Sequence, residues 1–215
     1  MAESNNQTQD QEAPHDPHVT PTRQESPSET MSALGIVQDG EPILRRTATR
    51  FDLPDDGADA QRVLAELHAA ADRVMTAHTF GKGMGLAAPQ IGIDRAAALV
   101  RPPGPAEPVV LLNPRIIETS TEHDQQYEGC LSFFDVRCRI PRSLVVHVEH
   151  QDVDGTWRIT VFERGIARLV AHEIDHLHGK LCHDHLPAGT HPIPVEQYRG
   201  TGTAWDYRAT STARE

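Results

Sequence analysis

Two histidines and a glutamate near the C-terminal end have the spacing of a catalytic metal site. They lie in the run His172-Glu173-Ile174-Asp175-His176, which has the pattern His-Glu-x-x-His. Residues four apart lie on one face of a helix, so His172 and His176 can bind one divalent ion while Glu173 borders its open side. A catalytic ion of this kind also binds a water and lowers its pKa to about 7. The pattern predicts a metal-dependent hydrolase that needs a third protein ligand.

Two cysteines are candidates for this third ligand. Cys182 stands where the extended metzincin motif has its last histidine. Metzincins also place a methionine turn after that motif, whereas the last methionine of this chain is Met84, far upstream. Cys130, within residues 128–132 (EGCLS), can supply a thiolate instead. We therefore favour Cys130 over Cys182.

Hydrophobic periodicity predicts the elements that must position these residues. Residues 58–78 have apolar side chains near helical spacing, which predicts an amphipathic helix. Helical periodicity returns from about residue 165 to 178, around the histidines. Apolar runs between polar breaks predict strands at 96–100, 109–117, 144–149 and 157–162, with a hairpin at Asp154-Gly155. Strands that precede one ligand-bearing helix predict an α+β fold.

Composition and charge narrow the class of protein. The chain has 215 residues with 38% hydrophobic content, which is enough for one sizeable domain with tails. Its net charge is -11, and its Lys and Arg residues are scattered, so we expect neither nucleic-acid nor membrane binding. It has neither an apolar run of roughly 20 residues nor a signal-peptide pattern, which predicts a cytoplasmic location.

The two ends of the chain differ from its centre in composition. Residues 1–33 are polar and almost without large apolar groups, so we expect a disordered N-terminal tail. Residues 187–215 are predicted to form a loosely structured C-terminal tail, in which Trp205 and Tyr207 could dock locally. The predicted catalytic domain is therefore 34–186.

Three separated segments resemble the signature motifs of the peptide deformylases. They are 83–90 (GMGLAAPQ), 128–132 (EGCLS) and 172–177 (HEIDHL), in the family's order and at similar separations. The resemblance extends to Pro141-Arg142 and covers about residues 36–186. It implies a single domain of mostly antiparallel strands around a central helix that carries the His-Glu-x-x-His motif, with an additional N-terminal amphipathic helix. Phe133 and Phe134 replace an aliphatic residue and a proline that are common in the family, so the pocket walls are expected to differ.

The resemblance also implies a reaction and a ligand set. The ligands would be Cys130, His172 and His176, with Fe(II) as the native ion and Zn(II) able to replace it. The reaction would remove the N-formyl group from the initiator formyl-methionine of nascent polypeptides and release formate. A water bound to the ion would attack the formyl carbonyl, with Glu173 as general base and acid. The partners would be N-formyl-methionyl nascent peptides near the ribosome exit, and we expect a monomer.

Other residues of the three segments are expected to bind the substrate. The Gln90 side-chain amide and the Leu131 backbone N–H would stabilise the negative oxygen that develops on the formyl group. Gly83 and Gly85 would let a peptide backbone approach closely. Glu128 would contact the substrate backbone or fix the ligand loop.

Two other functions are compatible with the same residues. A metallopeptidase would cleave internal peptide bonds with the same ion and the same glutamate. A non-catalytic structural metal site would use Cys138 or Cys182 as a fourth protein ligand and leave no position for water.

Overall fold

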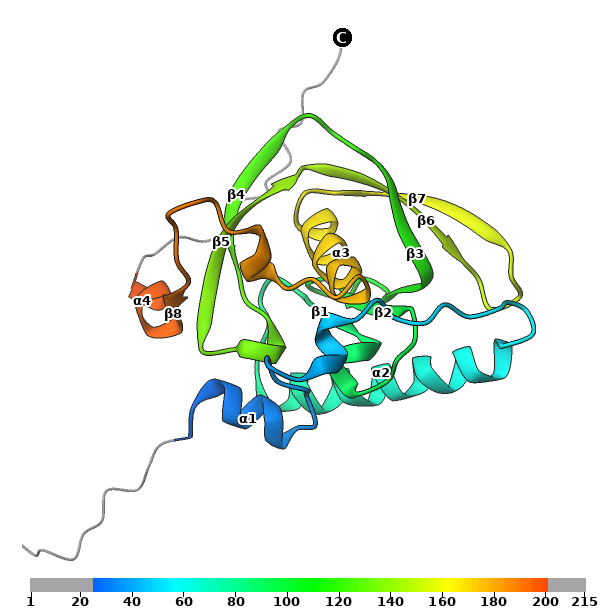
Figure 1. Cartoon of the computed structure of the whole chain (residues 1–215), viewed down its shortest axis with the longest axis horizontal. Coiled ribbons are helices and arrows are strands. Elements are labelled where there is room, and N and C mark those ends of the chain that lie inside the picture. Colours follow the sequence, from blue (N-terminus) through cyan, green and yellow to red (C-terminus); the bar gives the residue numbers. More distant parts are fainter. Residues whose placement is uncertain (1–24, 201–215) are drawn as a thin grey trace, which may run out of the picture.

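The protein is a mixed α+β domain in which antiparallel strands surround one central helix, α3 (Figure 1). The computed structural model describes residues 25–200. Its helices are α1 (Pro27–Ala33), α2 (Gly57–Ala77), α3 (Arg164–Leu177) and α4 (Val195–Gly200), with the short 3-10 helices η1 (Pro42–Arg45), η2 (Ala88–Ile91), η3 (Leu131–Phe133) and η4 (Cys182–His185). Its strands are β1 (Met84–Ala87), β2 (Ala97–Arg101), β3 (Val109–Thr119), β4 (His123–Glu128), β5 (Val136–Ser143), β6 (Val145–Gln151), β7 (Trp157–Glu163) and β8 (Ile193–Pro194).

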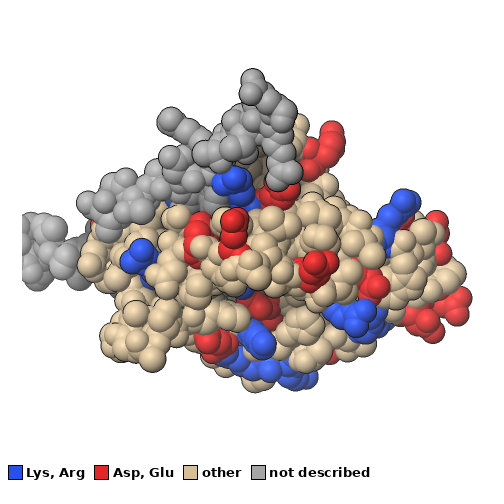
Figure 2. Space-filling model, turned by 90° about the horizontal axis from the view of Figure 1, so that it is seen from above, with Lys and Arg blue, Asp and Glu red and all other residues tan. Residues whose placement is uncertain are grey.

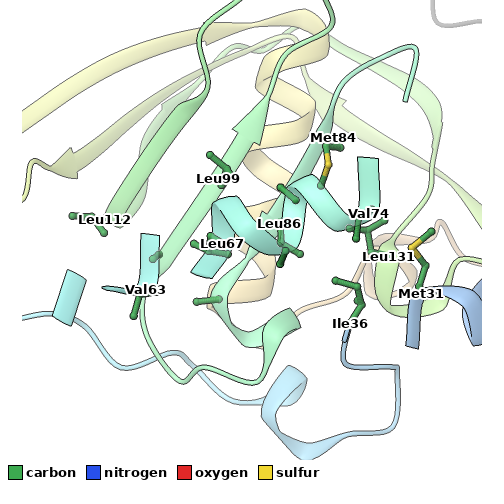
Figure 3. Close-up of a cluster of buried hydrophobic side chains, with 14 of the residues drawn as sticks. Met31, Ile36, Val63, Leu67, Val74, Met84, Leu86, Leu99, Leu112 and Leu131 are labelled. Atoms are coloured by element: carbon green, nitrogen blue, oxygen red, sulfur yellow. The ribbon is translucent and has the colours of Figure 1, made fainter. Parts of the chain in front are cut away.

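The strands form two antiparallel sheets, and helices cover both faces of the larger one. The sheets have the orders β1-β2-β3-β6-β7 and β4-β5-β8. Neighbouring residues of β2 point to opposite faces, as the pleat of a strand requires. Leu99 packs with Leu67 of α2, whereas Val100 packs with Val170 and Ile174 of α3. Figure 3 shows the α2 side of this core, where Leu67, Leu86 and Leu99 lie together.

Helix α3 begins at the residue that follows β7, without a connecting loop. Glu163 ends the strand and Arg164, with a φ of 54°, begins the helix. Val170 and Ile174 of α3 are buried against the large sheet, and His172 and His176 are also buried. The helix therefore holds the metal-binding pattern inside the domain.

The predicted apolar runs fall in β2, β3, β6 and β7, and the hairpin at Asp154-Gly155 is confirmed by the antiparallel pairing of β6 with β7. Gly155 has a φ of 86°, a conformation that glycine adopts without strain. Strands β4 and β5 have no corresponding prediction. Strand β4 has the sequence HDQQYE, which contains no apolar run: Asp124 and Glu128 contact Arg168, whereas His123 and Gln125 are exposed.

Parts of both predicted tails are ordered. Helix α1 lies within the segment that we expected to be disordered, because Met31 gives it an apolar anchor in the α2 cluster and Ser26 and Glu29 form a capping box. Elements β8 and α4 lie within the predicted C-terminal tail and pack on β5. Residues 1–24 and 201–215, with Trp205 and Tyr207, lie outside the described part of the chain.

Charged side chains of both signs are interspersed on the face of the molecule that Figure 2 shows. Within residues 25–200, no helix combines the length and the apolar composition that crossing a membrane requires.

Replacement of Leu67 by alanine should destabilise the domain by about 2–5 kcal/mol, because it removes buried methyl groups between α2 and the sheet. Urea or thermal unfolding would measure this loss. Met75→Ala on the same helix is the control, since Met75 is 43% exposed and should cost far less. Equal losses in the two variants would contradict this description of the core.

Candidate metal centre

Cys130, His172 and His176 meet in the interior of the domain. Gly129 separates the cysteine from the end of β4, and both histidines lie on α3. One ligand atom from each residue lies within 4.8 Å of the other two, and all three residues are buried. Cys130 Sγ lies 3.3 Å from His176 Nε2. The structure thus brings together the three residues that the sequence predicts as metal ligands.

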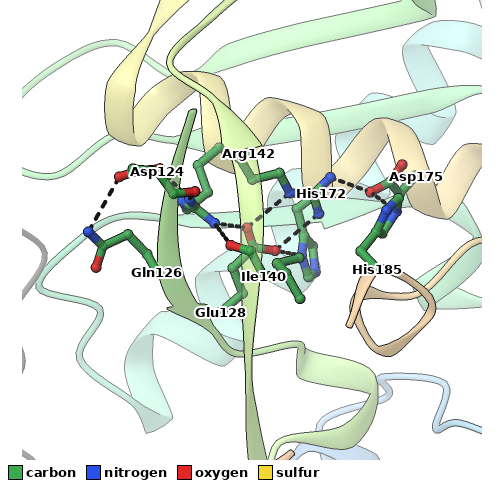
Figure 4. Close-up of polar contacts among 9 residues, drawn as sticks. Asp124, Gln126, Glu128, Ile140, Arg142, His172, Asp175 and His185 are labelled. Atoms are coloured by element: carbon green, nitrogen blue, oxygen red, sulfur yellow. Dashed lines mark hydrogen bonds and ion pairs between the residues drawn. The ribbon is translucent and has the colours of Figure 1, made fainter. Parts of the chain in front are cut away.

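Glu128 fixes the orientation of His172. Glu128 Oε2 lies 2.9 Å from His172 Nδ1, which leaves Nε2 of that ring available for an ion (Figure 4). Arg142 donates to both carboxylate oxygens of Glu128 at 3.0 and 3.1 Å, and Arg168 donates to Oε1 at 2.6 Å. These contacts engage both carboxylate oxygens and support the role of fixing the ligand loop, while Glu128 also lines the cavity described below.

The charge of Glu128 is maintained by these neighbours. Burial opposes its ionisation, but the positive charge of Arg142 and the hydrogen bond with His172 hold the pKa of Glu128 well below its usual range. Arg142 also donates to Asp175 at 2.6 Å. The network therefore fastens α3 to β4 and β5.

Arg168 is a member of this network that the sequence did not indicate. It is 1% exposed and lies one helical turn before His172. Besides Glu128, its guanidinium donates to the Asp124 carboxylate and to the Ile140 carbonyl at 2.5 and 3.2 Å. An arginine in an otherwise apolar helical run is a signal, because such a charge is almost never fully buried without partners.

Glu173 follows the predicted ligand His172 in the sequence, and its side chain packs closely against Gly85. It is 2% exposed, and burial raises its pKa to about 7. A Cβ atom added to Gly85 would lie 2.2 Å from Glu173 Oε1, so only glycine allows this packing. Glu173 Oε2 has no hydrogen-bond partner among residues 25–200. A buried oxygen without a protein partner can accept a hydrogen bond or a proton from a bound water or substrate.

Gln90 presents its amide nitrogen to the centre. The Ala87 N–H donates to Gln90 Oε1 at 2.9 Å, which fixes which end of the amide faces the ligands. Gln90 Nε2 lies 3.7 Å from Cys130 Sγ and 3.3 Å from Ser132 Oγ. The side chain is therefore held as a hydrogen-bond donor next to the thiolate ligand.

Residues 36–39 make hydrogen bonds to Gln90 and Leu131, the two predicted oxyanion donors. No sequence pattern had indicated these contacts. Val37 N–H donates to the Gln90 carbonyl at 2.8 Å, and the Gln38 side chain donates to the Leu131 carbonyl at 3.3 Å. The segment thereby ties η2 to η3. Leu131 is the first residue of η3, where backbone N–H groups have no partner within the helix.

The donor set fits a catalytic divalent ion. Two imidazoles and one thiolate are three ligands of the types that zinc and iron bind, and three is the number found in catalytic sites. Cys138 and Cys182 are absent from the ligand group found within residues 25–200. They pack with Ile140, and the hydrogen bond between the two thiols, together with burial, raises the pKa of Cys182. A fourth cysteine ligand is therefore not favoured.

A cavity of about 300 Å³ is lined in part by His172, one of the three predicted ligands. Its lining includes the predicted residues Gly83, Gly85, Gln90, Leu131 and Glu173. Gly83 has a φ of 83°, and a Cβ atom there would lie 2.6 Å from the Arg101 carbonyl oxygen. Other parts of the lining are apolar side chains, namely Phe80, Met84, Phe134 and Leu169. The cavity can hold an apolar side chain next to the centre.

The family model and the relatives that match this chain are all deformylases. The profile of the Polypeptide deformylase family matches residues 33–191. A peptide deformylase of Limosilactobacillus reuteri is 34% identical over 164 residues, which cover 70% of this chain and 88% of that protein. A peptide deformylase of Acidobacterium capsulatum is 40% identical over 152 residues, which cover 68% and 82% of the two chains.

Solved structures show the same similarity. A class I type b peptide deformylase from Acinetobacter baumannii, bound to Met-Ala-Ser, has a TM-score of 0.62 and 31% identity, covering 70% of this chain and 96% of that chain. A Plasmodium falciparum peptide deformylase in complex with an inhibitor has a TM-score of 0.59 and 27% identity, covering 76% and 92%.

Replacement of Glu128 by glutamine should weaken metal binding about 10- to 100-fold, because His172 loses its carboxylate partner. Chelator competition with Zn(II) would measure the affinity. Thermal unfolding of the metal-free proteins would report any separate loss of stability. Glu149→Gln, which removes one partner of a surface pair with Arg115, is the matched control and should bind the ion as the wild type does. Unchanged affinity in a folded Glu128→Gln protein would contradict the role given to Glu128.

Proposed function

This chain belongs to the polypeptide deformylase family of hydrolases, and from that premise we propose that it removes the formyl group from N-formyl-methionyl peptides with a divalent ion held by Cys130, His172 and His176. The observation that carries the proposal is the buried group of these three residues, one of which, His172, lines a cavity together with the buried Glu173. A divalent ion bound there would polarise the formyl carbonyl and make a bound water acidic.

Side chains and backbone groups of the chain would transfer the proton and stabilise the negative charge on the formyl oxygen. Glu173 takes the proton of the attacking water and passes it to the leaving amine nitrogen. The amide nitrogen of Gln90 and the backbone N–H of Leu131 donate to the formyl oxygen as its negative charge grows. Water adds to the formyl carbon and the carbon–nitrogen bond breaks, so the products are formate and a peptide with a free amino terminus.

The cavity supports a methionine side chain at the reacting end of the substrate. Its apolar lining from Met84 and Leu169 stands next to the reaction centre, and burial of that side chain contributes binding free energy. The Acinetobacter baumannii relative is bound to Met-Ala-Ser, which has the sequence of a deformylated product. Gly83 and Gly85 line the cavity. Because glycine has no side chain, the backbone of a bound peptide can approach closely at these positions.

The ion and the cellular setting are part of the same proposal. We infer Fe(II) as the native ion and Zn(II) as a replacement, because imidazole and thiolate ligands suit both. The substrates would be nascent chains near the ribosome exit in the cytoplasm, and the enzyme would act as a monomer.

A comparison of two blocked peptides tests the reaction. The protein, prepared without oxygen and with its metal content measured, should release formate from formyl-Met-Ala-Ser and nothing from acetyl-Met-Ala-Ser. Replacement of Glu173 by glutamine should lower kcat by about 10²- to 10⁴-fold while the ion is retained, because the proton carrier is lost. Glu118→Gln, on the exposed part of β3, is the matched control and should keep wild-type activity.

Two results would contradict this proposal. Cleavage of internal bonds in both peptides, without formate, would support the metallopeptidase. Equal turnover by the wild type and by Glu173→Gln would exclude the proton-carrying role of Glu173.

Replacement of Gly85 by alanine should reduce kcat/KM about 100-fold, because the new Cβ atom displaces the Glu173 carboxylate by ångströms. Formate release and bound metal should be measured on the same sample, and we expect the metal content to stay near that of the wild type. Gly57→Ala is the control, since a Cβ atom there would meet its nearest atoms at an ordinary 3.5 Å. Wild-type kcat/KM in Gly85→Ala would show that Glu173 does not need this exact packing.

A further inference from the structure

A series of polar contacts connects the metal centre to a histidine that the proposed reaction does not use. It starts where the Glu128 carboxylate contacts His172, and it continues through Arg142 to Asp175. His185 Nε2 then lies 2.9 Å from Asp175 Oδ2, as Figure 4 shows. We call these five residues the His185 network. It joins the end of η4 to a predicted metal ligand on α3.

One oxygen of Asp175 is shared by two nitrogen atoms of this network. Arg142 Nη1 donates to Asp175 Oδ2 at 2.6 Å, and His185 Nε2 lies 2.9 Å from the same oxygen. An ionised carboxylate only accepts hydrogen bonds, so the second contact is favourable when Nε2 carries a proton of the His185 ring. Because β5 and η4 each bring a nitrogen to this atom, the Asp175 carboxylate cannot turn without losing one of the two contacts.

The segment after α3 fixes the position of His185. Lys180 N–H donates to the Asp175 carbonyl at 2.9 Å, so the chain turns back on the end of the helix. Leu181 N–H donates to the Asp184 carboxylate at 2.8 Å, and the Leu181 side chain is buried. His185 is the last residue of η4, directly after Asp184. These contacts hold the His185 ring beside the carboxylate of Asp175.

The exposed fraction of the side chains decreases along the network from η4 towards the metal centre. His185 and Asp175 are 30% and 16% exposed, whereas Arg142 and Glu128 are 9% and 3% exposed. Polar contacts are electrostatically stronger in the interior than in water, so each buried member restrains the next one. A change at His185 can therefore reach Glu128 through side chains that have little freedom to rearrange.

We propose that His185 is a positioning residue of the metal centre, which acts through its network to hold the Glu128 carboxylate against His172. The inference rests on the ligand set of the proposed function. His185 keeps the Asp175 carboxylate in place, and Asp175 in turn keeps Arg142 on Glu128. The His172 ring is then oriented before the ion arrives, and a ligand that is oriented in advance binds more tightly.

The Zn(II) affinity of two matched variants tests this role. His185→Leu removes the donor, whereas His185→Gln keeps an amide N–H near the position of Nε2. In chelator competition, His185→Leu should bind Zn(II) about threefold to tenfold more weakly than the wild type, a smaller loss than for a direct partner of a ligand. His185→Gln should restore most of this affinity. The visible spectrum of the Co(II)-loaded protein, which reports ligand geometry, should change in His185→Leu alone.

Two comparisons separate positioning from a general loss of structure. His183→Leu is the matched control, because His183 belongs to the same 3-10 helix and is 27% exposed but pairs with Asp184 instead of Asp175. It should bind Zn(II) as the wild type does. In the Glu128→Gln background, His185→Leu should change the affinity less than about twofold, because its effect passes through Glu128. Thermal unfolding of the metal-free proteins would report stability separately.

The positioning role and the proposed reaction fail on different results. Wild-type or tighter Zn(II) binding by folded His185→Leu would overturn the positioning role. An equal loss in His185→Gln or in His183→Leu, or a full loss that persists in the Glu128→Gln background, would do the same. If His185→Leu does not fold, His185→Ala takes its place in every comparison.

Formate release decides the reaction separately. Absence of formate from formyl-Met-Ala-Ser, with the differences in Zn(II) affinity intact, would contradict the proposed reaction alone. Failure of the wild type to bind Zn(II) would contradict both the proposed function and the role of His185.

Discussion

The buried carboxylate of Glu128 is the interaction on which the site depends. Its two oxygens bind Arg142, Arg168 and His172, so one negative charge joins β4, β5 and α3. Removal of a partner from such a group leaves an uncompensated buried charge, which typically costs about 3–5 kcal/mol. The Glu128 carboxylate balances the buried charges of Arg142 and Arg168. It also sets the orientation of His172, a predicted metal ligand. Stability and chemistry are therefore coupled at this residue.

Two of the three predicted metal ligands could be identified from the sequence because the His-Glu-x-x-His pattern lies within five consecutive residues. The spacing of His172 and His176 alone places them on one face of a helix, and both lie in helix α3. Cys130 is different, since nothing in its neighbours shows that it lies next to that helix. Its assignment came from three motifs taken together, and the structure places its sulfur 3.3 Å from His176 Nε2.

The parts that could not be predicted depend on contacts between distant segments. Strand β4 lacks the apolar alternation that indicates a strand, because Asp124 and Glu128 belong to the charge network and His123 and Gln125 are exposed. Helix α1 is short, and its order comes from Met31 in a remote cluster. The hydrogen bond from Val37 to Gln90 uses a backbone N–H, which gives no sequence signal, and the Gln38 side chain reaches Leu131 across 93 residues of sequence.

The direct junction of β7 and α3 restricts how this domain can vary in length. Each residue of a helix turns it by about 100°, so one residue inserted between Glu163 and Arg164 would rotate both imidazoles away from Cys130. A deletion would rotate them in the opposite sense. The turn at Gly155 is restricted by packing instead, because Val153 packs against the α2 cluster and a Cβ atom on Gly155 would lie 3.0 Å from the Leu53 carbonyl oxygen. Length variation among homologous chains should therefore avoid the β7–α3 junction.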